Sequence, residues 1–194
     1  MMPPGQLTAF TPEQQHDLIG YLASTSQVPL PGEPGAEKFV VANRIPGALE
    51  GEGLRTTTTT GGKASPQPME HFVRGNWNWS GGTQLWWTGG RPGDRLDLTL
   101  PVASPGTYDV QIVLTKAPGY AILKFLLDGK PIGEAFDGYS PPGAGIVHSP
   151  VLTLSKADLP AGDHRLTLEI TGANPDATIS YMAGIDYVHL KRVP

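Results

Sequence analysis

From Lys38 onward, apolar residues occupy every second position in several short stretches of the chain. Side chains of a β-strand point alternately to opposite faces, so a period of two predicts strands with one buried face. The clearest stretches are 96–102, 108–114 and 166–170. No helical pattern separates them, and about eight to ten such strands are typical of two antiparallel sheets packed face to face. We therefore expect an all-β, two-sheet jelly-roll sandwich over residues 38–194.

Turn-forming residues support this expectation. The chain has 25 glycines and 20 prolines, and 16% of its residues are charged, which favours many short strands joined by turns. YAILKFLL (120–127) is followed by Asp128-Gly129 and then by KPIG, which predicts a two-residue hairpin. The TTTTT run at 56–60 is either an edge strand or a solvated loop, and its β-branched side chains favour the strand.

The N-terminal part has a different character. Thr11, Pro12 and Gln14 have the spacing of a helix start, so we expect a short helix from about Pro12 to Ser24. Gly20 weakens this helix, which therefore needs a surface to lie on. The proline- and glycine-rich stretch that follows is typical of a semi-rigid linker. The expected parts are a helical segment at 1–25, a linker at 26–37 and the sandwich at 38–194.

Several classes of function are disfavoured by composition. The net charge is -4, and no run of basic residues is longer than Lys191-Arg192, so we expect no nucleic-acid partner. The absence of cysteine excludes a disulfide, a thiolate metal site and a cysteine nucleophile. No window approaches eighteen consecutive apolar residues, and the first residues lack signal-peptide features, so we expect no membrane span and no export signal in the chain itself.

Three acidic residues stand where apolar residues are expected. Glu50 and Glu52 share parity with Leu54, and Asp186 shares parity with Val188, so in regular strands these acids would point inward. Carboxylates that converge in this way suit a hard cation, and ligation by oxygen alone is the preference of calcium. We therefore predict a structural calcium site formed by Glu50, Glu52 and Asp186.

Two other interpretations of these acids remain open. The glutamates could be exposed at an edge or paired with Arg44 or Arg55. They could also act as catalytic acids, because the carboxyl pairs of glycoside cleavage meet in space and follow no spacing rule.

All four tryptophans of the chain lie in NWNWSGGTQLWW, residues 76–87. Trp86 and Trp87 are adjacent, so in a strand one is buried and the other displayed. Trp77 and Trp79 share a side and precede a Ser-Gly-Gly turn, a position where binding groups are commonly mounted.

The tryptophan-rich stretch at 76–87 favours a role in glycan binding. We expect Trp77 and Trp79 to be at least partly exposed and to form one wall, with amide hydrogen bonds from Asn76 and Asn78. Tyr120 and Tyr139 are weaker candidates for a second wall. Large aromatic residues in sandwiches also serve as core, and this alternative stays open.

Signals for enzymatic chemistry are weaker. The five histidines are scattered, with no two at metal-ligand spacing, and Ser80 lacks the preceding glycine of a nucleophile elbow.

The motifs carry a resemblance. The Glu-x-Glu of LEGEGL (49–54) and the closing GIDYVHL (184–190) resemble carbohydrate-binding modules of families six and thirty-five, which have the galactose-binding-like fold. The resemblance implies a structural calcium site at this pairing. Residues 45–190 are also similar to an uncharacterised bacterial sandwich domain that is attached to secreted or cell-surface enzymes and to haem proteins.

The beginning of the chain resembles the end of a class I cytochrome c domain, and Met2, Pro3, Tyr21 and Leu22 match its motif positions. The Cys-x-x-Cys-His attachment motif is absent, so we expect no haem in this chain and interpret it as a piece of a longer polypeptide. The alternative is a native N-terminal helix that docks on the sandwich.

Together these observations favour a non-catalytic accessory module that binds a polysaccharide or glycan. We expect it to be part of a larger exported protein, periplasmic or extracellular at the cell surface, with the other domains of that protein as partners. One alternative is a structural or protein-interaction module attached to a cytochrome c electron-transfer protein. A second alternative is a glycoside-acting enzyme.

Overall fold

The computed structural model describes residues 11, 44–69, 72 and 79–193. The described sandwich belongs to one compact unit, Asn43–Pro194. The predicted helix at 12–24, the linker at 26–37 and the cytochrome-like segment lie outside the described residues, as do Asn76, Trp77 and Asn78, so these expectations remain predictions. In the part of the chain that is described, no helix is long and apolar enough to cross a membrane.

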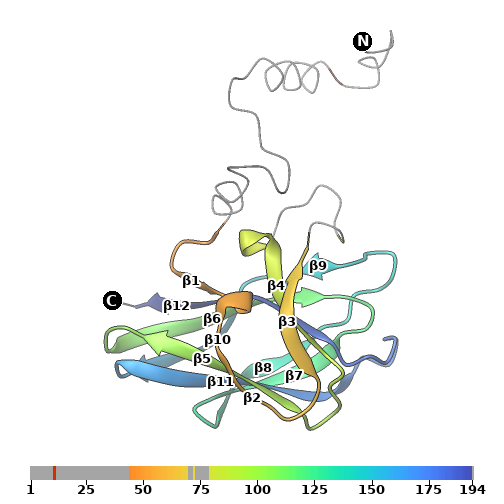
Figure 1. Cartoon of the computed structure of the whole chain (residues 1–194). Coiled ribbons are helices and arrows are strands. Elements are labelled where there is room, and N and C mark those ends of the chain that lie inside the picture. Colours follow the sequence, from red (N-terminus) through yellow and green to blue (C-terminus); the bar gives the residue numbers. More distant parts are fainter. Residues whose placement is uncertain (1–10, 12–43, 70–71, 73–78, 194) are drawn as a thin grey trace. The chain divides into compact units, whose positions relative to one another are not determined.

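Two antiparallel sheets form the described sandwich (Figure 1). The seven-stranded sheet contains β1 (Ala48–Glu50), β3 (Lys63–Pro68), β4 (Thr83–Thr88), β6 (Gly106–Lys116), β9 (Val147–His148), β10 (Leu152–Leu159) and β12 (Ala183–Arg192). The five-stranded sheet contains β2 (Thr56–Thr59), β5 (Arg95–Val102), β7 (Ala121–Leu127), β8 (Lys130–Asp137) and β11 (Gly162–Ala173). Two short 3-10 turns complete the described elements, η2 (Gly51–Gly53) and η3 (Ser80–Gly82).

The strand order shows many crossings between the sheets. The large sheet runs β10-β6-β12-β4-β3, with β1 paired to β12 and β9 paired to β6. The small sheet runs β2-β5-β11-β7-β8. All these pairs are antiparallel, which confirms the predicted all-β two-sheet sandwich.

The core lies between the facing sides of the two sheets. Alternate residues of β5 and β11 enter it and are fully buried: Leu96, Leu98, Leu100, Leu166, Leu168 and Ile170. These are the positions that the period of two predicts, because burial of one sheet face requires apolar side chains at every second residue. Their partners from the large sheet include Trp87, Ile112 and Leu114, each 0% exposed.

Two local predictions are also confirmed. Asp128 and Gly129 connect β7 to β8 with φ of 49° and 81°, the left-handed conformation that a two-residue hairpin of this twist requires. The threonine run forms β2, which pairs only with β5 at the edge of the small sheet.

The parity argument for Asp186 is wrong, although the residue is buried. A bulge between Ile185 and Tyr187 interrupts the pairing of β12 with β6. It adds one residue to the strand, so that both Ile185 and Val188 enter the core. Asp186 therefore faces away from the core, and other elements cover it on the outer side of the large sheet.

Candidate cation site and the adjoining groove

The acid cluster, by which we mean Glu50, Glu52 and Asp186, is assembled where β1 lies beside β12. Glu50 ends β1 opposite Tyr187, one residue from Asp186. After Glu50 the chain leaves the strand and enters the 3-10 turn η2, so the strand parity predicted for Glu52 is wrong. The tight turn nevertheless returns Glu52 to the side of Glu50.

Gly51 makes this arrangement possible. A Cβ at this position would lie 2.2 Å from the Ile185 carbonyl oxygen, closer than any real Cβ contact. Only glycine lets the η2 turn pack this tightly on the backbone of β12. The local sequence Glu-Gly-Glu thus places two carboxylates against the strand that carries Asp186.

Ser80 joins the strands of the acid cluster. Its backbone N–H donates to Asp186 Oδ1 at 2.9 Å, and its hydroxyl donates to Glu50 Oε1 at 2.8 Å. The same hydroxyl accepts a hydrogen bond from the backbone N–H of Ile45 at 3.0 Å. Ser80 therefore fixes one oxygen of each of two carboxylates and leaves their second oxygens free.

Those second oxygens have no hydrogen-bond partner among the described residues. Glu50 Oε2, Glu52 Oε2 and Asp186 Oδ2 are all buried and unsatisfied. His148 Nε2 lies 3.2 Å from Asp186 Oδ2, a contact without hydrogen-bond geometry that is an ion pair when the imidazole is protonated. A buried carboxylate oxygen without a partner is costly, and native proteins compensate it with a hydrogen bond, an ion or ordered water.

Burial changes the acidity of all three groups. The pKa of Glu52 is raised to about 7, mainly by desolvation and also by the charges of Glu50 and Asp186, while a backbone hydrogen bond and the charge of Arg44 act in the opposite direction. Desolvation also raises the pKa of Glu50 and of Asp186. The raised pKa values show that burial disfavours the charged forms of these acids, and repulsion between like charges adds to this effect for Glu50 and Glu52. A nearby positive charge would counter both effects.

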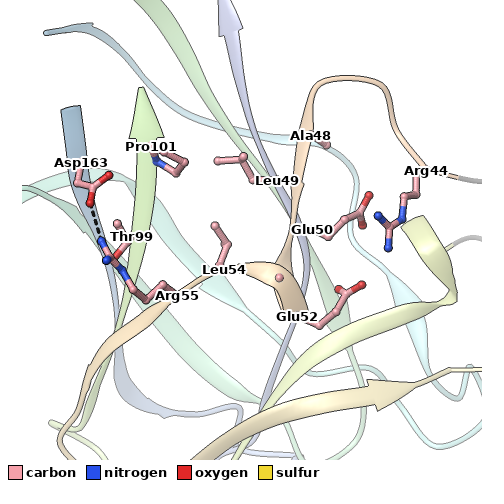
Figure 2. Close-up of a pocket in the computed structure, with 11 residues that line it drawn as sticks. Arg44, Ala48, Leu49, Glu50, Glu52, Leu54, Arg55, Thr99, Pro101 and Asp163 are labelled. Atoms are coloured by element: carbon pink, nitrogen blue, oxygen red, sulfur yellow. Dashed lines mark hydrogen bonds and ion pairs between the residues drawn. The ribbon is translucent and has the colours of Figure 1, made fainter. Parts of the chain in front are cut away.

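The two arginines nearest the acid cluster, Arg44 and Arg55, have different roles. Arg55 pairs with Asp163 at 2.5 Å, so the open interpretation in which it neutralises the glutamates is wrong. Arg44 acts on the cluster, since its charge lowers the pKa of both Glu50 and Glu52. Figure 2 shows the Arg44 guanidinium beside the Glu50 carboxylate and the Arg55–Asp163 ion pair farther along.

A solvent-open groove of about 560 Å³ connects these groups. Arg44, Glu50 and Glu52 line one end, and the Arg55–Asp163 ion pair lines the other (Figure 2). Its apolar lining is formed by Ala48, Leu49, Leu54 and Pro101. Glu50 and Glu52 can therefore be reached from solvent, whereas Asp186 is 0% exposed behind them.

The donor set of the acid cluster fits a hard cation. Three buried carboxylate oxygens without a hydrogen bond supply the oxygen ligands that calcium prefers. The side chains are not closed around one point, since no group of three or more acidic or histidine residues in the described ranges has metal-binding geometry. Binding would draw the glutamate side chains, which lie at the open end, toward Asp186.

Trp79 is not exposed, which contradicts its predicted role as a glycan wall. It is 3% exposed and lies on the outer face of the large sheet, where its indole N–H donates to Thr115 Oγ1 at 2.9 Å. Its ring contacts the His148 ring, with centroids 4.2 Å apart. Both contacts involve residues far away in sequence, so the local pattern could not predict the burial.

The predictions for the other aromatic residues have different outcomes. Tyr120 is 5% exposed, and its hydroxyl accepts a hydrogen bond from Gln84 Nε2 at 3.3 Å, so it cannot offer the open wall proposed for it. Tyr139 is half-buried and keeps an accessible part. Trp87 is 0% exposed in the core and Trp86 is half-buried on the opposite face, as their adjacency predicts.

Two residues of the site carry no recognisable sequence signal. Ser80 precedes two glycines and looks like part of a turn, and His148 is one of five scattered histidines. Their roles follow from tertiary contacts with Glu50, Asp186 and Trp79.

Comparisons with known proteins address the fold. No model of a known protein family matches the sequence, and no curated protein matches it either. The chain is similar in structure to a Paenibacillus xanthan lyase, with a TM-score of 0.63, 22% identity and 87% of this chain covered. The match spans only 15% of the length of that lyase.

Smaller likenesses extend to isolated modules. A family 35 carbohydrate-binding module from an environmental isolate has a TM-score of 0.45 at 15% identity, over 74% of this chain and 91% of that one. A carbohydrate-binding module CBM36, solved in complex with calcium and xylotriose, has a TM-score of 0.42 at 17% identity, over 74% and 98%. The similarity to the lyase shows a shared sandwich fold.

Proposed function

We propose that this chain is a non-catalytic accessory module that binds a glycan as part of a larger exported protein, and that calcium held by Glu50, Glu52 and Asp186 stabilises it. The observation that carries the calcium part is the set of three buried carboxylate oxygens that accept no hydrogen bond, on neighbouring elements. The motif resemblance to carbohydrate-binding modules supports the glycan part. The shared fold with a small portion of a xanthan lyase supports an accessory role.

Calcium would act on stability rather than on chemistry. The ion would add positive charge to the acid cluster and tie β1 and the η2 turn to β12. Asp186 would provide the rigid ligand, because Ser80 already holds its other oxygen. Glu50 and Glu52 would complete the set from the groove side.

The glycan surface is assigned by elimination among the aromatic candidates. Trp79 and Tyr120 are enclosed, so Trp77 with Asn76 and Asn78 and the half-buried Tyr139 remain as the proposed contacts. The proposed surface is therefore smaller than the sequence pattern indicates. An exported, periplasmic or cell-surface location suits a glycan ligand and is part of the same proposal.

Thermal unfolding tests the calcium site. A ligand that binds only the native state at about 100 times its Kd adds about 2.7 kcal/mol of stability, which raises Tm by about 5 to 10 °C for a domain of this size. We expect calcium to produce such a rise and a chelator to remove it. Glu52→Gln and Asp186→Asn should lose most of the rise, whereas Glu134→Gln, an exposed acid on β8, should keep it. An unchanged wild-type Tm would refute the calcium site.

Retention of the purified chain on a glycan array and on polysaccharide gels tests the ligand class. We expect retention on one glycan class, loss of retention in Trp77→Ala, and an unchanged Tm in that variant. A lack of binding to every glycan tested would favour the structural or protein-interaction module. Release of sugar products would instead identify an enzyme.

A further inference from the structure

Arg44 lies beside the acid cluster and lines the same end of the groove as Glu50 and Glu52 (Figure 2). Its Nε is 3.3 Å from the point where a Cβ on Gly81 would lie, and Glu52 Oε1 is 3.6 Å from that same point. Gly81 itself has φ of 63° and no side chain, which leaves room for both groups beside its backbone. Figure 2 shows the guanidinium beside the Glu50 carboxylate, and its charge acts on Glu52 as well.

A guanidinium and a divalent ion cannot share this position. Two cations held against the same pair of carboxylates repel each other, and a partly buried site screens that repulsion less than water does. One cation must leave when the other binds. Arg44 is the one that can leave, because it is exposed and its side chain is long, whereas the acids stand on the backbone of β1, η2 and β12.

We propose that Arg44 is an internal competitor for the cation site: it neutralises Glu50 and Glu52 when calcium is absent, and calcium must displace it in order to bind. This inference rests on the proposed calcium site and adds a residue that sets its affinity. Arg44 acts through the carboxylates and is not itself a metal ligand.

The groove provides the route for this exchange. Arg44, Glu50 and Glu52 all line its open end, so an ion from solvent reaches the carboxylates without unfolding any element. The displaced guanidinium can move into the same open space. The site would therefore exchange calcium reversibly, unlike a closed structural site that traps its ion during folding.

Competition gives Arg44 opposite effects in the two states of the protein. In metal-free buffer, removal of the guanidinium leaves Glu50 and Glu52 without a counter-charge, so stability falls. In the presence of calcium, the ion no longer has to displace a positive group, so affinity increases. If Arg44 had only a structural role, its removal would lower both the stability and the calcium affinity.

The experiment measures calcium binding by calorimetry at fixed ionic strength in the full chain, with Tm in metal-free buffer as a second readout. Arg44→Gln should bind calcium about tenfold more tightly than wild type, which corresponds to the loss of one local positive charge in a partly screened site. Arg44→Lys keeps the charge and should stay closer to wild type. Arg91→Gln, on the β4–β5 turn, makes the same change in net charge and should leave the affinity unchanged.

The outcomes separate this inference from the calcium site on which it rests. If wild type binds calcium and Arg44→Gln binds with equal or weaker affinity, the competition is refuted and the site stands. If wild type shows no binding but Arg44→Gln binds, the competition is supported in its strongest form. If neither protein binds calcium, the proposed site and the inference both fail.

Discussion

Glu52 is the residue whose protonation most directly reports the state of the acid cluster. Burial holds its pKa at about 7 in the folded protein, above the ordinary value of 4.5. A raised pKa means that the folded state binds the proton more tightly than the unfolded state does. The stability contributed by protonated Glu52 is therefore fully present below pH 4.5 and is lost as pH rises through 7.

This shift predicts a pH-dependent difference between wild type and Glu52→Gln in metal-free buffer. The variant cannot ionise at this position, so it should gain stability relative to wild type between pH 4.5 and 7. Paired Tm measurements across this range check the result, and Glu134→Gln serves as the control at an exposed acid. Parallel pH profiles for wild type and Glu52→Gln would contradict the assigned burial. Added calcium should remove the advantage of the variant.

Trp79 provides a second prediction for a single residue. Because its ring is enclosed and its N–H is bonded to Thr115, Trp79→Ala should destabilise the fold by about 3 to 5 kcal/mol, as large-to-small core changes do. Trp79→Phe keeps a ring against His148 and loses mainly the hydrogen bond, so it should cost about 1 kcal/mol plus a small packing loss. Chemical denaturation of both variants measures the difference. A near-wild-type Trp79→Ala would mean that the ring is exposed after all.

At the scale of elements, the η2 turn determines whether the acid cluster forms. Gly51→Ala would place a methyl group 2.2 Å from the Ile185 carbonyl oxygen, so either η2 or β12 must move. We expect a loss of about 1 to 3 kcal/mol, the usual range for overpacking, together with a smaller calcium-induced rise in Tm. Gly53→Ala is the matched control, since its nearest atom would be the Glu50 Cβ at 3.9 Å, an ordinary contact. Equal effects of the two substitutions would show that the close approach at Gly51 is unimportant.

Sequence patterns predict the elements that depend on local rules. The period of two in β5, β6 and β11 and the turn residues Asp128-Gly129 follow directly from strand geometry and backbone sterics. The same rules fail where the backbone departs from a regular strand. The η2 turn interrupts the parity of Glu52, and the bulge in β12 reverses the side on which Asp186 lies.

The candidate site is predictable only in part for the same reason. The three acids stand out because carboxylates at expected core positions need partners, and Ser80 joins two of them, Glu50 and Asp186, despite the irregular backbone. Ser80 contacts Asp186 across 106 residues of chain, and His148 contacts it across 38 residues. No local sequence pattern encodes these contacts. The burial of Trp79 likewise depends on long-range contacts, with Thr115 and His148 on the outer face of the large sheet.

At the scale of the whole molecule, the described core is built from the sandwich alone. Its buried apolar cluster runs from Leu85 on β4 to Val188 on β12, and the flanking residues begin at Leu49. Both sheets contribute to this cluster, so the strands between β1 and β12 contain the contacts that a cooperative domain needs.

Deletion of residues 1–36 should therefore leave folding nearly unchanged. Hydrophobic stabilisation scales with the apolar area removed from water, and the described core loses none of its members in this truncation. We expect a single cooperative thermal transition with a Tm within about 2 °C of the full chain, a difference of less than about 1 kcal/mol for a domain of this size. Matched melts of the two proteins, each with and without calcium, provide the measurement, and the calcium-induced rise should be equal in both because Arg44 and the acid cluster are retained. A broad transition or a much lower Tm in the shortened protein would show that the N-terminal segment is part of the folding unit, and would favour the interpretation in which a native helix docks on the sandwich.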